Sequence, residues 1–385
     1  MTKPLNTVLI GAGGYGASYI RLLMDKVVEG LNFVAVVDPY AKNAHVYDQF
    51  KDVVPVYDRL EEFFASGATA DLTIVSTPIH LHYEQSVTAL KGGSHVLCEK
   101  PLVPTIAELD SLQNIAAASG KTLSVGFQWC YSSVMQDLKS RILAGEFGKP
   151  VCLKTLVNWP RDWEYYSRGG GWAGSIRSKE GHVVYDSVAS NATSHYLQNM
   201  LFLLGPTMED SVVLDNVKAE NYRVNNIESF DTCVLSGETD GSKVLFITSH
   251  GVNYQMSPVM HYSFEKATIL INNFKQDNIC TIHHKDGRIE ELGNPLADGD
   301  KNKLEYTMKS IRGEHSVVCS PRTVRPFTAL IEFLFEQVPV TEFPKNLVVK
   351  DDVEKRTYVK NLHLDLVDCF NKVMLPSELG VPWAV

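Results

Sequence analysis

The 385-residue chain lacks long apolar runs, paired-cysteine motifs and any excess of positive charge. A bilayer-spanning helix needs roughly 20 consecutive apolar residues, and no stretch reaches that length. The first apolar run ends at Gly11, which is too early for a signal peptide. The formal net charge of −9 argues against binding to nucleic-acid phosphates, although a local site can still attract an anionic small molecule. We therefore expect no membrane and no nucleic-acid partner.

The seven cysteines are scattered, their number is odd, and none lies in a Cys-x-x-Cys motif. They form neither a disulfide framework nor a zinc pattern. Reduced thiols are typical of the cytoplasm, where we expect the protein to reside. His283 and His284 lie beside a hairpin-turn signal without further ligands nearby, so no metal site is expected.

The length suits two domains, since one domain usually holds on the order of 100–200 residues. Strand and helix patterns alternate at first, which predicts an α/β domain with a doubly wound parallel sheet over residues 1–128. Longer β-rich segments and a hairpin signal at Lys285-Asp286-Gly287 then predict an α+β domain over residues 129–385, with a large, mostly antiparallel open sheet. Two helical patterns close this domain, at 326–337 and 351–373.

A glycine-rich turn, Gly11-Ala12-Gly13-Gly14-Tyr15-Gly16, follows the first apolar strand pattern. A helical pattern comes next, then a second strand that ends at Asp38, and this order is typical of a Rossmann dinucleotide-binding domain. Gly11 permits the tight turn, Gly13 lets the backbone approach a pyrophosphate, and Gly16 lets the helix pack on the strand. Asp38 would accept hydrogen bonds from ribose hydroxyls and repel a 2′-phosphate. NAD is therefore favoured over NADP, although Lys42 nearby could change that preference.

A second candidate site lies where the strand pattern Val96–Cys98 ends in Glu99-Lys100-Pro101. Charges at the carboxyl ends of strands in an open α/β sheet face the ligand crevice. Lys100 is therefore a candidate catalytic residue. The alternative is a strand end that merely stops in solvent.

Further motifs accompany these two. They are Thr77-Pro78-x-x-x-His82, Gly126-Phe127 and, in the second half, His195 before Leu203-x-Gly205. Together the motifs resemble the Gfo/Idh/MocA oxidoreductases, which act mostly on sugars and polyols. The resemblance implies that Lys100 lies beside the nicotinamide and hydrogen-bonds the reacting hydroxyl, and that a cis peptide precedes Pro101. The residues that we expect at the cofactor are Gly11, Gly13, Tyr15, Gly16, Asp38, Thr77, Pro78, His82, Glu99 and Lys100.

A helical pattern runs from Asp186 or Ser187, either of which can cap it, to Leu204. Asn191 and His195 stand at i and i+4, so they share one helix face. A histidine of near-neutral pKa suits a proton acceptor for an alcohol that loses hydride, whereas a helix histidine taken alone is more often structural. The resemblance places the family's catalytic base at His195.

Two residues depart from the family's commonest pattern. The family usually has aspartate four residues before the histidine, where this chain has Asn191, and asparagine after Gly-Phe, where this chain has Gln128. Asparagine can hold the imidazole or a substrate hydroxyl, but it cannot stabilise an imidazolium by charge. Either Lys100 carries more of the electrostatic work, or Asp186 approaches from the start of the helix, or the substrate differs from the usual polyols.

Aromatic and basic residues gather at 159–172. Such a segment suits sugar faces, because CH groups stack on rings while hydroxyls bond to charged groups. Arg161 and Arg168 would also suit a carboxylate or phosphate. The alternative is a loop packed on the sheet or on a neighbouring subunit. The residues that we expect at the substrate are Lys100, Gln128, Arg161, Trp172, Asn191 and His195.

The sequence thus predicts an NAD-dependent oxidoreductase that transfers hydride between the nicotinamide and a secondary alcohol of a sugar, an inositol-like polyol or a sugar acid. Lys100 would polarise the hydroxyl oxygen, His195 would take its proton, and Asn191 would orient the histidine or the substrate. Two alternatives stay open, an NAD-dependent glycoside hydrolase of the same fold and a non-catalytic dinucleotide-binding sensor. The resemblance further implies a homodimer or homotetramer that assembles through the sheet of the second domain.

Overall fold

A computed structural model describes residues 3–168, 171–272 and 279–384. Two compact units divide the chain. The first unit takes residues 1–131 and 298–325, and the second takes 132–297 and 326–385. None of the helices in the described ranges is both long and apolar enough to cross a membrane.

The first unit is built on one parallel sheet. Its strands are β1 (Leu5–Ile10), β2 (Leu31–Val37), β3 (Val56–Tyr57), β4 (Leu72–Val75), β5 (His95–Cys98) and β6 (Leu123–Val125). They pair in the order β3-β2-β1-β4-β5-β6, and every pair is parallel. This is the strand order of a Rossmann fold. All four residues of β4 are buried, as expected for a central strand that helices cover on both faces.

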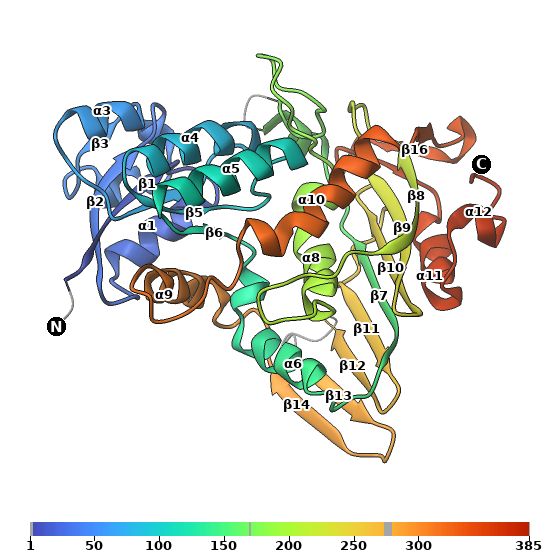
Figure 1. Ribbon diagram of the computed structural model, residues 1–385. Helices are drawn as coiled ribbons and strands as arrows, with labels where there is room; N and C mark the ends of the chain where they lie inside the picture. Colours follow the sequence, from blue (N-terminus) through green and yellow to red (C-terminus); the bar gives the residue numbers. More distant parts are fainter. Residues whose placement is uncertain (1–2, 169–170, 273–278, 385) are drawn as a thin grey trace. The chain divides into compact units, whose positions relative to one another are not determined.

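Helices cover both faces of this sheet. They are α1 (Gly16–Met24), η1 (Ala41–Asn43), α2 (Tyr47–Phe50), α3 (Leu60–Ala65), α4 (Ile79–Lys91), α5 (Ile106–Ser119), η2 (Gln128–Tyr131) and α9 (Gly299–Ile311). In Figure 1, α4 and α5 lie on one side of the sheet, and α1 and α9 lie on the other. Local signals set the ends of α5, because the Thr105 side chain accepts a hydrogen bond from the Glu108 N–H and Gly120 adopts the left-handed conformation. The predicted doubly wound parallel sheet is confirmed.

The first unit differs from the predicted domain 1–128, because its first segment ends at residue 131 and because residues 298–325 return to it. Leu304 and Met308 of α9 belong to the same hydrophobic core as Tyr19 and Ile20 of α1. Burial of their apolar side chains holds this distant segment in the first unit.

The second unit contains a nine-stranded sheet. Its strands are β7 (Pro150–Asn158), β8 (Asp215–Arg223), β9 (Thr232–Thr239), β10 (Ser242–Ser249), β11 (Val259–Phe264), β12 (Ala267–Asn272), β13 (Cys280–His284), β14 (Ile289–Gly293) and β15 (Val340–Glu342). The order is β14-β13-β12-β11-β7-β10-β9-β8-β15. The β7–β10 and β8–β15 pairs are parallel and the other pairs are antiparallel, which confirms the predicted mostly antiparallel sheet.

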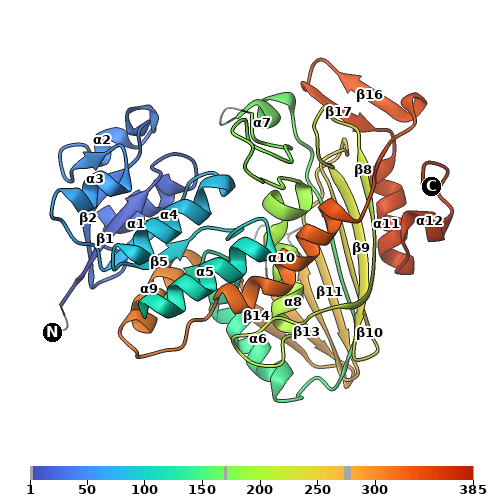
Figure 2. The ribbon, with the colours of Figure 1, turned by 45° about the horizontal axis from the view of Figure 1, so that its top comes forward.

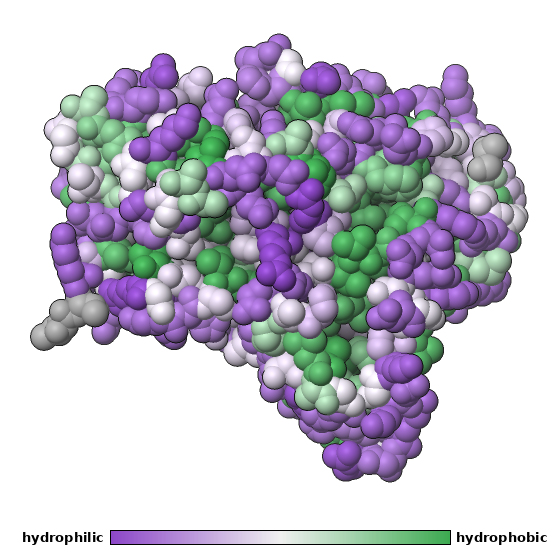
Figure 3. Space-filling view, viewed as in Figure 1, coloured by the Kyte–Doolittle hydropathy of each residue, from purple (hydrophilic) through white to green (hydrophobic). Residues whose placement is uncertain are grey.

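The β13–β14 hairpin turns at Lys285-Asp286-Gly287, as predicted, and its tip is hydrophilic in Figure 3. The remaining elements of this unit are α6 (Ser133–Leu143), α7 (Trp163–Ser167), η4 (Val188–Ala192), α8 (Ser194–Leu203), α10 (Pro321–Glu336, in this unit from Pro326 on), η5 (Lys345–Leu347), β16 (Val348–Asp351), β17 (Arg356–Val359), α11 (Leu362–Lys372) and α12 (Pro376–Leu379).

Both faces of the large sheet carry helices. In Figure 2, α8 lies on one side of the sheet, while α11 and α12 lie on the other. Leu362, Leu366 and Cys369 of α11 share a core with Leu245 and Ile247 of β10. The C-terminal segment therefore covers part of the sheet face that the family resemblance would leave for contacts between subunits.

Two helix predictions need correction. The pattern at 351–373 forms a helix only over Leu362–Lys372, because its first part folds into the β16–β17 hairpin, where Asp351 accepts hydrogen bonds from the N–H groups of Val353 and Glu354. The helix expected from residue 186 or 187 to residue 204 is divided into the π-helical turn η4 and the α-helix α8.

Candidate active site

The glycine turn between β1 and α1 has the geometry that its residues predict. Gly11 has a φ of +85°, and a Cβ there would lie 2.3 Å from the Ser76 carbonyl oxygen. A Cβ on Gly16 would lie 2.0 Å from the carbonyl oxygen of Gly11, so both positions exclude any side chain. A Cβ on Gly13 would meet nothing within 4 Å. The fold itself thus leaves Gly13 open, and a backbone-hugging ligand such as a pyrophosphate explains a glycine there.

Asp38 follows the end of β2 and holds this turn in place. Its Oδ2 accepts a hydrogen bond from the Ala12 N–H at 2.9 Å, and its Oδ1 accepts one from the Tyr40 N–H at 2.8 Å. The carboxylate therefore brings negative charge to the end of β2 beside the glycine turn. Such a position suits ribose hydroxyls and disfavours a 2′-phosphate.

Glu99 and Lys100 directly follow β5, and the peptide bond between Lys100 and Pro101 is cis, as the family resemblance implied. His82 of α4 is buried, and its ring nitrogens face the carbonyls of Thr77 at 2.8 Å and Pro101 at 2.9 Å. His82 thus links the end of β4 to the backbone beside Lys100.

Glu99 is buried and has two partners that sequence patterns did not reveal. Its Oε1 lies 2.7 Å from Lys303 Nζ of α9 and accepts a hydrogen bond from Tyr19 Oη at 2.7 Å. Burial alone would raise the pKa of Glu99, but the charge and hydrogen bond of Lys303, together with the Tyr19 hydroxyl, lower it below its ordinary value. Glu99 is therefore an anion whose charge is balanced within the first unit.

Tyr15 of the glycine turn joins this network. Its single hydroxyl proton is shared between two acceptors, Gln128 Oε1 at 3.0 Å and Asp300, and its oxygen accepts from Lys303 Nζ at 3.2 Å. Lys303 also lies 4.7 Å from the centroid of the Tyr15 ring. Lys303 thus links Glu99, which is 204 positions away in sequence, to Tyr15, and Tyr15 in turn contacts Gln128.

The remaining cofactor candidates lie at the end of β4. Thr77 Oγ1 donates to Gln85 Oε1 at 2.6 Å, and Pro78 immediately precedes α4. All predicted cofactor residues therefore lie in the first unit, at the carboxyl ends of β1, β2, β4 and β5 or in the segments that follow them.

The candidate residues Asn191 and His195 lie in the second unit. Ser187 caps η4 through a reciprocal hydrogen-bond pair with Ser190, as one of the two predicted caps. Asp186 instead accepts a hydrogen bond from Asn191 Nδ2 at 2.8 Å and one from the Gly174 N–H at 2.6 Å. The sequence leaves three explanations for Asn191 at the position where the family usually has aspartate. The contact between Asp186 and Asn191 supports the one in which Asp186 approaches from the helix start.

Aromatic rings lie close to the two arginines, Arg161 and Arg168. Arg168 Cζ lies 3.6 Å from the centroid of the Tyr165 ring and 5.4 Å from that of Trp172. Arg161 Cζ lies 4.8 Å from the Tyr165 centroid and 5.6 Å from that of Trp159. The substrate candidates Arg161 and Trp172 therefore belong to one cluster around Tyr165.

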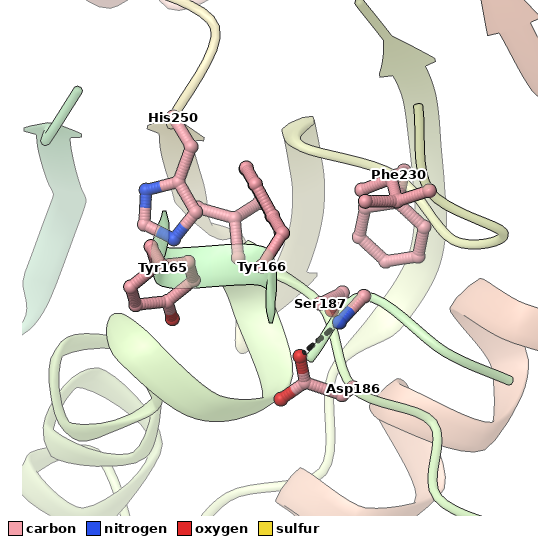
Figure 4. A pocket seen from close by; sticks show the side chains of 9 residues that line it. Tyr165, Tyr166, Asp186, Ser187, Phe230 and His250 are labelled. Atoms are coloured by element: carbon pink, nitrogen blue, oxygen red, sulfur yellow. Dashed lines mark hydrogen bonds between the residues drawn. The ribbon is translucent and has the colours of Figure 1, made fainter. Parts of the chain in front are cut away.

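A small pocket adjoins this cluster, and Figure 4 shows Tyr165, Tyr166 and His250 on one side of it and Asp186 on another. The space that these side chains enclose is too small to hold a ligand. His250 was not foreseen, because a lone histidine after a strand carries no sequence signal. Its Nδ1 donates to the Trp159 carbonyl at 2.7 Å, so its Nε2 is an acceptor in the neutral ring.

The first unit matches a known family. Residues 5–127 match the Gfo/Idh/MocA family model, which is described as an oxidoreductase family with an NAD-binding Rossmann fold. Over these residues the resemblance stated from the motifs is confirmed. The first unit is therefore an NAD-binding Rossmann domain.

Similar proteins include an inositol 2-dehydrogenase of Streptomyces avermitilis, 34% identical over 155 residues that make up 40% of this chain and 44% of that protein. A 2,7-anhydro-N-acetylneuraminate hydratase of Mediterraneibacter gnavus is 26% identical over 208 residues, which are 54% of this chain and 51% of the relative. The chain thus spans about half the length of these curated relatives.

Among solved structures, the WlbA dehydrogenase from Bordetella pertussis, in complex with NADH and UDP-GlcNAcA, is similar with a TM-score of 0.69. It is 20% identical, and the match covers 86% of this chain and 96% of that one. At this identity the likeness shows the fold, which extends over both units.

Proposed function

We propose that this chain is an NAD-dependent oxidoreductase that acts on a secondary alcohol of a sugar, an inositol-like polyol or a sugar acid. The observation that carries the proposal is Lys100, a cation at the carboxyl end of β5 in an NAD-binding domain. Ligands of such sheets bind at the carboxyl ends of the strands. Lys100 therefore brings positive charge to the end of the sheet where a substrate oxygen would bind.

The residues of the first unit fit NAD. The open space at Gly13 accommodates a pyrophosphate, and Asp38 offers carboxylate oxygens to ribose hydroxyls. NAD, when bound, accepts or returns the hydride. Inositol dehydrogenases among the relatives, and a dehydrogenase of the same fold bound to NADH, support this choice.

The chain's own residues bind the reacting hydroxyl and remove its proton. Lys100 hydrogen-bonds the hydroxyl oxygen and stabilises negative charge as the proton leaves. His195 takes that proton as general base. Asn191, held by Asp186, orients the imidazole or the substrate, and the carboxylate of Asp186 supplies the charge that an aspartate at position 191 would supply.

The test is an assay of nicotinamide reduction against polyols, aldoses and sugar acids, with NAD and NADP side by side. We expect NAD to be preferred and Asp38→Ala to reduce that preference. We expect Lys100→Ala to lose turnover, and His195→Ala to lose turnover while it keeps NAD binding. Equal use of both cofactors by the unmodified protein would contradict the role of Asp38. Loss of NAD binding in His195→Ala would make His195 structural.

A second candidate function has one observation in its favour. One relative is a hydratase by name, and hydration does not oxidise the substrate overall. Similar sequences can therefore serve reactions that leave the nicotinamide unchanged at the end. An NAD-retaining glycoside hydrolase or related enzyme would release product from a glycoside without a net change in nicotinamide absorbance. A dinucleotide sensor would instead keep its biological activity in Lys100→Ala.

We further propose that the protein works as a homodimer or homotetramer in the cytoplasm. All seven cysteines, each within the described residues, are free thiols, which supports a reducing compartment. Light scattering of the purified protein tests the assembly. Because α11 covers part of the large sheet, we expect the contact to use strands β11 to β14. A monomer at micromolar concentration would contradict the assembly.

A further inference from the structure

Two guanidinium groups converge on one aromatic ring in the second unit. Arg168 and Arg161 lie 3.6 Å and 4.8 Å from the Tyr165 centroid, and each has a second ring nearby. A guanidinium held over a ring keeps its N–H donors at its edge, where they can bind an oxyanion in a fixed geometry. Both arginines are only half-buried, so a ligand can reach them.

These two charges lack acidic partners. Within residues 3–168, 171–272 and 279–384, no carboxylate lies within 4.0 Å of Arg161 or Arg168, whereas Arg141 contacts Glu146 at 2.5 Å and Glu290 at 2.9 Å. Burial, together with the positive charges of Arg161 and Arg168, lowers the pKa of His250 to about 3. Two adjacent cations without a counter-ion attract an anion.

The cluster is packed against the element that carries the proposed base. The Trp159 ring beside Arg161 meets the edge of Tyr196, which follows His195 on α8, with centroids 5.6 Å apart. Tyr165 packs on His250 at 5.5 Å between centroids, and both line the same pocket as Asp186 (Figure 4). An anion held by the arginines would therefore belong to a molecule that also reaches α8.

We propose that Arg161 and Arg168 bind an oxyanion on the substrate, either a carboxylate or a phosphate, so that the substrate is an anionic sugar and not a neutral polyol. This inference rests on the proposed oxidoreductase function and narrows its substrate class. The competing explanation is that the arginines only hold the rings of Trp159, Tyr165 and Trp172 in place by cation–π contacts. In that case they would not distinguish charged from neutral sugars.

The experiment compares kcat and KM of the full chain with NAD for matched sugars. D-Glucose and myo-inositol are the neutral sugars, D-gluconate and D-glucuronate carry a carboxylate, and D-glucose 6-phosphate carries a phosphate. The variants are Arg161→Gln, Arg168→Gln, their double variant and Arg168→Lys, which keeps the charge but loses the planar fork. Arg288→Gln is the control, because Arg288 pairs with Asp286 at the hydrophilic hairpin turn.

We expect charged sugars to be preferred and their KM to rise about 10- to 100-fold in each glutamine variant, with a smaller change in kcat. Whichever charged series responds identifies the oxyanion as carboxylate or phosphate. Arg288→Gln should leave every constant unchanged. A preference for neutral sugars, or equal effects of the double variant on charged and neutral sugars, would overturn the inference.

Direct binding separates this inference from the proposed function. If no sugar reduces NAD, the proposed oxidoreductase function fails, and calorimetry with gluconate and glucose 6-phosphate then tests the arginines alone. Binding that the double variant abolishes supports the anion site. If neither ligand binds the unmodified protein, no anion site exists.

Discussion

The residue with the largest unforeseen role is Lys303. It is fully buried and lies 2.7 Å from Glu99, which is also buried. Removal of one member of a buried ion pair leaves an uncompensated charge, whereas replacement of both by neutral side chains is often tolerated. The pair is therefore a sensitive point of the first unit, directly beside Lys100.

We expect Lys303→Met to lower the free energy of unfolding of the first unit by about 3–5 kcal/mol, because Glu99 would stay buried without its cation. The double variant Glu99→Gln/Lys303→Met should recover most of that loss. Urea denaturation followed by circular dichroism measures both. Lys301→Met, which removes only an exposed i,i+4 pair with Glu305, should cost less than about 0.5 kcal/mol. A double variant less stable than Lys303→Met would contradict the pairing.

The pH dependence of stability reports on His250. Burial, reinforced by the positive charge of Arg161, lowers its pKa to about 3, while an unfolded histidine titrates near 6.5. The unfolded state therefore binds the proton first, and the contribution of His250 to stability is complete above about pH 6.5 and is lost as the pH falls towards 3. Between pH 6 and 4, the unmodified protein should lose about 1.4 kcal/mol per pH unit more than His250→Asn. Denaturation at several pH values, with the exposed His182→Asn as control, measures this slope, and parallel curves would contradict the burial argument.

At the scale of elements, the boundary between η4 and α8 decides how Asn191 and His195 are presented. The sequence reads as one helix, but five residues form a π-helical turn before α8 begins at Ser194. Such turns are frequent at functional sites. Ser187 caps the turn, while Asp186 connects it to Gly174 and Asn191, so neighbouring residues have separate tasks.

This separation gives a matched pair of variants. Asp186→Ala removes the acceptor of Asn191 and of the buried Gly174 N–H, so we expect a loss of about 1–3 kcal/mol in stability and at least about a tenfold fall in kcat. Ser187→Ala removes only the cap and should cost about 1 kcal/mol with kcat unchanged. Thermal unfolding and steady-state kinetics measure both. Equal effects of the two variants on kcat would show that Asp186 acts through stability alone.

At the scale of the whole molecule, local signals predicted most of the first unit. The glycine turn, Asp38 and the strand before Glu99 are short patterns whose geometry depends on neighbours in sequence. Lys303 could not be found in this way, because it is separated from Glu99 by 204 positions and sits in an ordinary amphipathic helix. The π-helical turn could not be predicted for another reason, because an apolar stripe with helical spacing does not reveal one extra residue in a turn. The site in the second unit was likewise named by resemblance and local chemistry, and Asp186 and His250 gained their contacts only through the fold.

The return of residues 298–325 predicts which fragment of the chain folds alone. A fragment of residues 1–131 lacks Leu304 and Met308, whose burial contributes roughly 1.5–3 kcal/mol each, and it leaves Glu99 without Lys303. We expect this fragment to unfold without cooperativity or to aggregate. A second fragment, 1–131 joined to 298–325, should fold, because the Asn302 side chain donates to the Tyr131 carbonyl at 3.2 Å and a short Gly/Ser linker can connect these ends.

NAD distinguishes a folded fragment from a collapsed one. At a free concentration of 100 times its Kd, a ligand that binds only the folded state stabilises it by about 2.7 kcal/mol. The joined fragment should show this shift in urea denaturation, because all predicted cofactor residues lie within it. The same fragment with Lys303→Met should be less stable but should still respond to NAD if any folded population remains. If residues 1–131 alone prove as stable as the joined fragment, neither α9 nor the buried Glu99–Lys303 pair stabilises the first unit.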